Sequence, residues 1–255
     1  GVMAVACIVG SLCLRAGRGS LKLTVETCRR LLTMSTSPTG RHGLAREKTS
    51  SYHHGDLRRA LLDAALEMVR TEGVAQLSLR EVARRAGVSH AAPYRHFASK
   101  EALLAAVAEE GFRRLEEALR AAAAEAPGPL EALQASGRAY VAFAMANPGH
   151  FRVMFGPGAS SEPYPALAEA THSAFGVLVG TLQACIDAGL AVRRPAAELA
   201  LSAWSIVHGL AQLLLDGVLR GAGSPDELSA LVTARLVEGV RAPAAAQAPA
   251  RRKRG

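Results

Sequence analysis

Residues 87–97 (GVSHAAPYRHF) combine hydrogen-bond donors and aromatic rings without an acidic side chain. The donors are His90, Tyr94, Arg95 and His96. Side chains of these types bind the edges of nucleic-acid bases and phosphate oxygens. Ala91 and Ala92 would let the backbone approach a DNA groove, and their methyl groups suit contact with thymine methyls. The segment therefore predicts a contact with DNA.

Pro93 limits the secondary structure that this segment can form. Proline lacks an amide hydrogen and clashes with the carbonyl four residues earlier, so a helix tolerates it only in the first turn. We therefore expect a short helix that begins near His90 or Ala91 and ends around Phe97. Ser89 would cap this helix.

Two further helices are predicted before this one. Apolar residues recur at helical spacing from about Gly55 until Gly73. Ser78-Leu79-Arg80-Glu81 then has the sequence of a capping box, and Gly87 supplies a left-handed residue at the end of the second helix. Three short helices, with a turn of about four residues between the second and third, predict a helix-turn-helix unit. In such a unit the third helix enters the DNA major groove and the second crosses the backbone.

Phosphate contacts are expected where helices begin. Amides near Ser78, Ser89 and Ser99 would point outward and suit phosphate oxygens. Lys100 stands in the first turn of a fourth helix, where a cation is slightly unfavourable, and a nearby anion would explain its position. The predicted DNA contacts are Ser78, Arg80, Ser89, His90, Ala91, Ala92, Tyr94, Arg95, His96 and Lys100.

The composition favours an all-helical protein, with 49% hydrophobic and only 4% aromatic residues. We expect helices at about 100–124, 130–146, 165–188, 196–220 and 225–240. A break at 147–149 and a short apolar piece at 150–155 follow the second of these helices. The expected fold is all-α: an N-terminal three-helix domain with a helix-turn-helix, joined by a long helix to a C-terminal helical bundle for ligand binding and dimerisation. The expected divisions are a disordered leader or upstream extension at 1–52, the DNA-binding domain at 53–114, the C-terminal domain at 115–241 and a disordered basic tail at 242–255.

Charge is distributed unevenly along the chain. Residues 46–100 carry ten Lys and Arg against six Asp and Glu, whereas residues 101–240 carry nine against fifteen. This predicts one module for a polyanion and another for a different partner. The cysteines show no metal-ligand spacing and fit a reducing cytoplasm. Residues 199–215 approach membrane-spanning length, but their polar residues favour a buried bundle helix.

The C-terminal half contains large side chains that could line a cavity for a small molecule. They are Tyr140, Phe143, Phe151, Met154, Phe155, Phe175, Trp204 and His208. Simple core packing is the alternative for each of them. His150, His172 and His208 lack the spacing of metal ligands, so neither a metal nor another cofactor is predicted. Residues 204–215 are apolar nearly all round, which predicts that a second copy of the chain covers one face of that helix and of residues 225–240.

An enzymatic function has little support. The sequence contains no nucleophile elbow, no phosphate-binding glycine loop and no zinc-protease motif. Two alternatives to a DNA-binding regulator stay open. One is a protein that binds DNA without sequence preference, and the other is a helical small-molecule-binding protein or enzyme without operator function.

Residues 78–107 closely resemble the DNA-binding signature of the TetR family of bacterial transcriptional regulators. The matches are Ser78, Val82-Ala83, Ala86-Gly87-Val88-Ser89, Tyr94-Arg95-His96-Phe97 and Lys100-Glu101-Ala102-Leu103. Pro93 departs from the pattern, since many members have leucine there, and this leaves the operator sequence open. Residues 203–217 resemble the Trp-x-x-x-His-Gly element of one subgroup of TetR-like effector domains.

The resemblance implies a homodimer in which Tyr94 and Lys100 contact phosphates and residues 89–92 read bases. We therefore expect a cytoplasmic, nucleoid-associated repressor that binds a near-palindromic operator in double-stranded DNA. A small-molecule effector would move the long helix at 100–124 and weaken the affinity for DNA.

Overall fold

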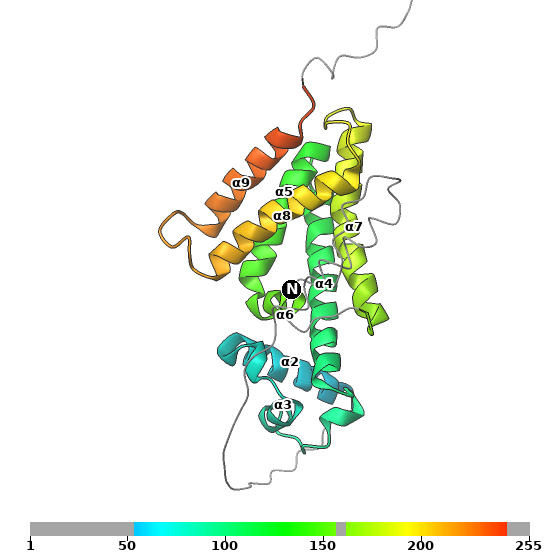
Figure 1. Cartoon of the computed structure of the whole chain (residues 1–255), viewed down its shortest axis with the longest axis vertical. Coiled ribbons are helices and arrows are strands. Elements are labelled where there is room, and N and C mark those ends of the chain that lie inside the picture. Colours follow the sequence, from blue (N-terminus) through cyan, green and yellow to red (C-terminus); the bar gives the residue numbers. More distant parts are fainter. Residues whose placement is uncertain (1–53, 157–161, 244–255) are drawn as a thin grey trace, which may run out of the picture.

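The computed structural model describes residues 54–156 and 162–243, and these are almost entirely helical. Within these ranges the β-structure consists of one isolated bridge between Ala191 and Arg241. The predicted all-α fold is confirmed (Figure 1). The predictions for residues 1–52 and 244–255 lie outside the described residues. The residue predicted to begin the disordered tail, Ala242, is instead part of the folded structure. Ala242 is buried and donates its amide hydrogen to the Leu190 carbonyl at 2.8 Å.

A small module of short helices occupies the lower part of Figure 1. Its elements are α2 (His54–Glu72), η2 (Val74–Gln76), α3 (Leu79–Arg85) and η3 (Pro93–Arg95). Leu61, Met68 and Val82 form its core. Gly87 has a φ of +69°, which confirms the left-handed residue predicted after the second helix.

The long helix α4 (Lys100–Ala124) has the predicted bounds and runs from the small module into the upper bundle (Figure 1). The Ser99 hydroxyl accepts a hydrogen bond from the Ala102 amide at 3.2 Å, as expected of a residue that caps a helix. Three ion pairs at i,i+4 spacing form on its surface: Glu109–Arg113, Glu110–Arg114 and Glu116–Arg120. This helix physically joins the two halves of the molecule.

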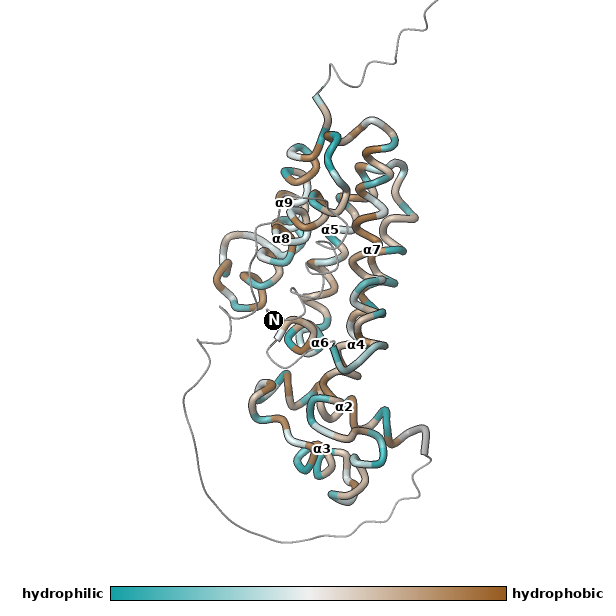
Figure 2. Tube along the Cα trace, turned by 45° about the vertical axis from the view of Figure 1, so that its right-hand side comes forward, coloured by the Kyte–Doolittle hydropathy of each residue, from teal (hydrophilic) through white to brown (hydrophobic). Residues whose placement is uncertain are grey.

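The upper bundle contains the remaining helices. They are α5 (Pro129–Ala146), α6 (Pro148–Phe155), α7 (Pro165–Asp187), α8 (Ala196–Leu215) and α9 (Pro225–Val240). Figure 2 shows α7 running beside α4, while α5 packs against both α8 and α9. The predicted extension of α8 to residue 220 is wrong. Gly217 adopts a φ of +70°, which an α-helix cannot include.

Helix α6 lies between the small module and the bundle, and packs on both α2 and α4 (Figure 1). It begins at Pro148, inside the break predicted at 147–149, because proline is accommodated in the first turn of a helix. Gly149 faces Leu66 of α2, and Gly111 of α4 faces Met154 of α6. A methyl group at Gly111 would lie 2.5 Å from the Met154 sulfur, so the two helices require glycine there.

Among the described helices, α8 is the one that is long and apolar enough to cross a membrane. It packs against α5, α7 and α9, and its buried residues belong to the common core. They include Ala200, Trp204, Val207 and Ala211. Core helices of helical bundles have this same composition, which agrees with the interpretation made from the sequence.

Candidate nucleic-acid interface and cavity

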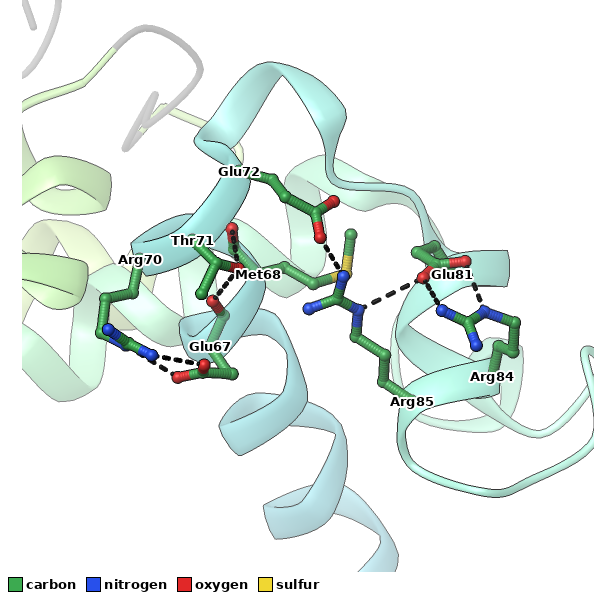
Figure 3. A network of polar contacts seen from close by, with 8 residues as sticks. All are labelled: Glu67, Met68, Arg70, Thr71, Glu72, Glu81, Arg84 and Arg85. Carbon is green, nitrogen blue, oxygen red and sulfur yellow. Dashed lines mark hydrogen bonds and ion pairs between the residues drawn. The ribbon is translucent and has the colours of Figure 1, made fainter.

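Ion pairs fix α3 against the end of α2 (Figure 3). The Arg85 guanidinium contacts the Glu72 carboxylate and also lies 3.2 Å from the Glu81 carboxylate. Arg84 donates to Glu81 at 2.8 Å. The hydrogen bond from Arg84 and the contact with Arg85 hold the pKa of Glu81 at about 2. Arg84 and Arg85 therefore have acidic partners within the protein, whereas the exposed Arg80 on the same helix pairs with none of the described residues.

The predicted capping box at α3 is half formed. The Ser78 hydroxyl accepts a hydrogen bond from the Glu81 amide at 3.2 Å. The Glu81 carboxylate turns to Arg84 and Arg85 instead of the Ser78 amide. A charged guanidinium binds a carboxylate more strongly than a neutral amide does, so the ion pairs replace the second bond of the box.

The short helix predicted from His90 or Ala91 to Phe97 is shorter in the structure and has 3₁₀ geometry. The Ala92 amide donates to the Ser89 carbonyl at 3.0 Å, and one 3₁₀ turn follows at Pro93–Arg95. Ser89 therefore accepts this hydrogen bond with its backbone carbonyl, and its hydroxyl does not cap a helix as predicted. Pro93 has no amide to extend a hydrogen-bond ladder, and Phe97 is buried in the core, so too few residues remain for a regular helix.

Most of the predicted DNA contacts lie on the surface. Tyr94 is 60% exposed, which is unusual for a tyrosine. The other exposed residues of the predicted set are Ser78, Arg80, Ser89, His90, Ala91 and Arg95, while Ala92, His96 and Lys100 are half-buried. Within the described ranges, no other residue forms a hydrogen bond or ion pair with the side chains of His90, Tyr94 or Arg95. These groups remain available to an external partner.

Lys100 has an internal role that the sequence analysis missed. Its ammonium group donates to the Val74 carbonyl at 3.0 Å and to the Ala75 carbonyl at 3.3 Å. These carbonyls belong to η2, so Lys100 ties the start of α4 to the segment that follows α2. These bonds use two of the three hydrogens of the ammonium group, and the phosphate contact predicted for Lys100 stays a prediction.

The upper bundle contains an apolar cavity of about 50 Å³ between α4, α5, α6, α7, α8 and α9. Four of the predicted residues line it: Tyr140, Phe155, Phe175 and Trp204. Phe143, Phe151, Met154 and His208 do not. The lining residues that the sequence analysis missed are Phe112, Leu115, Leu119, Leu133, Ser136, Gly137, Thr171, Ala174, Leu178, Ala203, Val207 and Leu236. Most are small or aliphatic, and helical spacing alone cannot distinguish a cavity wall from a filled core.

Three aromatic side chains form a polar chain beside the cavity. The Trp204 indole donates to the Tyr140 hydroxyl at 3.2 Å, and this hydroxyl lies 2.9 Å from the His208 Nδ1 atom. The Phe151 ring stacks on the His208 ring, and the two ring centroids are 5.3 Å apart. Burial raises the pKa of Tyr140 and lowers the pKa of His208. Both groups are therefore uncharged near neutral pH.

A second polar cluster joins the small module to the bundle. Glu110 of α4 accepts two hydrogen bonds from Arg59 of α2, both at 3.0 Å, and pairs with Arg114. His150 of α6 places its Nε2 atom 3.4 Å from Glu110, but this buried nitrogen forms no hydrogen bond within the described structure. Burial lowers the pKa of His150.

Helices α8 and α9 share an exposed groove on the outside of the bundle. Ile206 is 44% exposed and Leu231 is 54% exposed. The residues lining the groove are Leu199, Ser202, Ile206, Leu231, Val232, Arg235, Leu236, Gly239 and Val240. This is the surface that the sequence predicts a second copy of the chain to cover. Exposed apolar residues gathered in one place mark interaction surfaces in many proteins.

Two family models match the chain, on either side of the middle of α4. Residues 61–107 match "Bacterial regulatory proteins, tetR family", and residues 133–236 match "Tetracyclin repressor-like, C-terminal domain". The first match contains most of the small module, including η3, and the second contains most of the cavity lining. Together they span most of the described residues.

Two curated proteins are similar to part of the chain. The HTH-type transcriptional regulator BetI of Rhizobium meliloti is 38% identical over 78 residues, which cover 31% of this chain and 38% of that protein. The nucleoid occlusion factor SlmA of Aliivibrio fischeri is 35% identical over 104 residues, which cover 39% of this chain and 51% of that protein. The chain thus spans at most about half the length of these curated relatives.

Solved structures extend the similarity to the C-terminal half. A protein of unknown function from Rhodococcus sp. RHA1 has a TM-score of 0.65 at 38% identity, over 75% of this chain and 99% of that chain. The TetR family transcriptional regulator PfmR from Thermus thermophilus has a TM-score of 0.59 at 21% identity, over 70% of this chain and 97% of that chain. The second similarity concerns the fold alone.

Proposed function

The chain belongs to the TetR family of bacterial regulatory proteins, and on this premise we propose that it is a homodimeric transcriptional repressor, released from its operator by a small molecule. The models and relatives are those of regulatory proteins, which agrees with the expectation that the chain is not an enzyme. We assign DNA binding to residues 53–114 and ligand binding and dimerisation to residues 115–241, with α4 crossing this boundary. The expected location is the cytoplasm, at the nucleoid.

The observation that carries the proposal is the set of unpaired, exposed side chains around η3. His90, Tyr94 and Arg95 combine donors for bases and phosphates with access to solvent. A single 3₁₀ turn is sufficient for this purpose, since a recognition element must present only a few side chains to the major groove. Phe97, buried beneath the turn and covered by Arg58 at 5.7 Å from its ring centre, holds the element in place.

A dimer formed through the groove of α8 and α9 would complete the regulator. Each copy contributes two helices to such an interface, which gives a four-helix arrangement around a twofold axis. Two η3 elements would then meet successive major grooves, about 34–36 Å apart. The operator is expected to be a near-palindrome for this reason.

Ligand binding would reach the DNA-binding module through α4 and α6. The cavity of about 50 Å³ is far smaller than pockets for drug-sized ligands, which are roughly 300–1,000 Å³. A ligand must therefore displace lining side chains, among them Phe155 at the end of α6. The other end of α6 contacts α2 through Gly149 and faces the Glu110–Arg59 ion pair through His150. Movement of α6 and α4 would thus alter the position of the module.

Selection of bound duplexes from a random DNA pool tests the proposal. A regulator should recover a near-palindromic site and hold it against a roughly 10³-fold excess of unrelated DNA. Equal competition by unrelated DNA would instead support the protein that binds DNA without sequence preference. If the chain binds neither a selected site nor unrelated DNA, the result would support the small-molecule-binding alternative.

Two substitutions separate base recognition from backbone contact on the selected site. Replacing Tyr94 with Ala should weaken binding to all operator variants by a similar factor, because a phosphate contact carries no sequence information. Replacing His90 with Ala should change the preference at particular base pairs, by about 1–3 kcal/mol where a base contact is lost. Titration of a panel of single-base operator variants measures both effects. Unchanged relative affinities for His90→Ala would remove its assigned role.

A further inference from the structure

Ser136 stands out among the buried serine and threonine residues of the described structure. The other buried side chains of these two types all donate to a backbone carbonyl: Thr171 to Leu167 at 2.8 Å, Ser229 to Asp226 at 2.9 Å and Thr233 to Ser229 at 2.7 Å. Ser136 is only 3% exposed, and its hydroxyl has no hydrogen-bond partner in the described residues. Leaving a buried hydroxyl unpaired costs free energy, so a polar group without a partner calls for an explanation.

The place of Ser136 supplies that explanation. It lies on α5 one turn before Tyr140, and both residues line the apolar cavity. The Tyr140 hydroxyl is already engaged by Trp204 and His208, and the Thr171 hydroxyl hydrogen is used by Leu167. Ser136 is therefore the hydrogen-bonding group of the cavity wall that is left without a partner.

The cavity wall also excludes charge. None of its sixteen described residues is ionisable in the normal pH range except Tyr140, whose pKa is raised by burial. The nearby His208 has a pKa lowered by burial. A carboxylate or an ammonium group entering here would lose its hydration without gaining an opposite charge.

We propose that the cavity binds an uncharged, mainly hydrocarbon molecule with a single hydrogen-bonding oxygen, such as an alcohol, ketone or ester, and that Ser136 binds this oxygen. This inference rests on the proposed role of the cavity as the effector site. The aliphatic lining binds the hydrocarbon part, and the hydroxyl of Ser136 donates to or accepts from the ligand oxygen.

Trp204 provides a direct measurement, because it is the single tryptophan of the chain and lines the cavity. We would titrate the full chain with 1-octanol, octanoate and octyltrimethylammonium and record tryptophan emission. Saturable binding of 1-octanol, at least tenfold tighter than that of either charged probe, is the expected result. Tighter binding of octanoate or of the ammonium probe would overturn the proposed ligand class, as would the absence of a saturable response to 1-octanol.

Two matched variants test the role of Ser136. Ser136→Ala should weaken 1-octanol binding by about 2- to 10-fold, the usual effect of one neutral hydrogen bond, while the thermal unfolding midpoint stays equal or rises. Thr171→Val removes another cavity hydroxyl, whose hydrogen is already bonded, and should leave the octanol affinity within twofold of the parent chain. Equal losses in both variants would overturn the assignment to Ser136.

Failure of this inference can be told apart from failure of the proposed function. A chain that binds 1-octanol in the predicted way but selects no operator contradicts the proposed function alone. A chain that selects an operator but binds only charged probes contradicts the ligand class alone.

Discussion

At the scale of residues, internal partners decide which basic side chains can reach DNA. Arg84 and Arg85 form ion pairs with Glu81 and Glu72. Lys100 donates hydrogen bonds to two backbone carbonyls, whereas Arg80 and Arg95 are exposed. The basic surplus of residues 46–100 therefore overstates the number of cations available for phosphates. The number of charged residues in a sequence does not show which of them pair with each other in the folded protein.

Replacing Lys100 with Ala should mainly lower stability. The loss of hydrogen bonds from a charged donor to the Val74 and Ala75 carbonyls should cost roughly 1.5–3 kcal/mol, measured by urea unfolding. The dependence of operator affinity on salt should barely change. Arg95→Ala is the control and should lower the salt slope by about 0.9, the value for one phosphate contact. A comparable fall for Lys100→Ala would support the phosphate contact predicted from the sequence.

Glu81 should make the small module sensitive to acid. Its pKa is held at about 2 in the folded protein by Arg84 and Arg85, below its ordinary value of 4.5. The ion pairs therefore stabilise the folded state fully above about pH 4.5, and this contribution is lost as the pH falls towards 2. Urea unfolding of the parent chain and of Glu81→Gln should differ most near neutral pH and converge near pH 2. A difference that stays constant across this range would contradict the assignment.

At the scale of elements, close approaches between helices depend on small residues. Gly137 of α5 faces Thr233 of α9, and a methyl group added at Gly137 would lie 2.7 Å from the Thr233 Cγ2 atom. The same glycine lies in the cavity wall beside Ser136. The spacing of α5 and α9 therefore affects both the cavity and the helix that carries half of the proposed dimer groove.

Gly137→Ala should destabilise the bundle by roughly 1–2 kcal/mol, because overpacking outweighs the better helix propensity of alanine. Adding Thr233→Ser removes the obstructing methyl group and keeps a hydroxyl for the Ser229 carbonyl, so the double variant should lose less than the sum of the single ones. Gly180→Ala is the control, since nothing lies within 4 Å of the new methyl group there, and it should stabilise α7 by about 0.5–1 kcal/mol. Strict additivity of the first two substitutions would argue against the clash.

At the scale of the whole molecule, α4 and α6 connect a small DNA-binding module to a larger bundle (Figure 1). The proposed dimer depends on the outer groove of α8 and α9, far along the chain from η3. Because two recognition elements must be held at one fixed spacing, dimerisation and operator affinity are expected to be lost together.

A charge placed in the groove should separate the two copies. Leu231→Asp puts a carboxylate on a surface that would be buried in the dimer, so sedimentation should show a single-chain mass where the parent chain shows twice that mass. Operator affinity should fall in parallel. Val218→Asp changes another exposed apolar residue, outside the groove, and should leave the mass unchanged. Sedimentation of the parent chain as a stable monomer at micromolar concentration would contradict the proposed dimer.

The sequence by itself determined most of the helices and several of their ends. The bounds of α4 and α9, the cap at Ser99 and the left-handed Gly87 all follow from local rules: side-chain hydrogen bonds to nearby amides, helical periodicity and the conformational freedom of glycine. Those interactions span a few residues, so they can be recognised without knowing the fold. The hydrogen-bond donors of residues 89–95 could be recognised as candidate DNA contacts for the same reason, since their types and their order are read from one short segment.

Only the tertiary structure decided which side chains meet across helices. Lys100 is 26 residues from Val74, and Ser136 reaches a cavity built from five other helices, so no local pattern predicts either arrangement. The same holds for the collapse of the predicted third helix into one 3₁₀ turn, which depends on where the core receives Phe97. Contacts between distant segments depend on how whole helices pack, and packing sums many weak interactions that helical spacing alone does not specify.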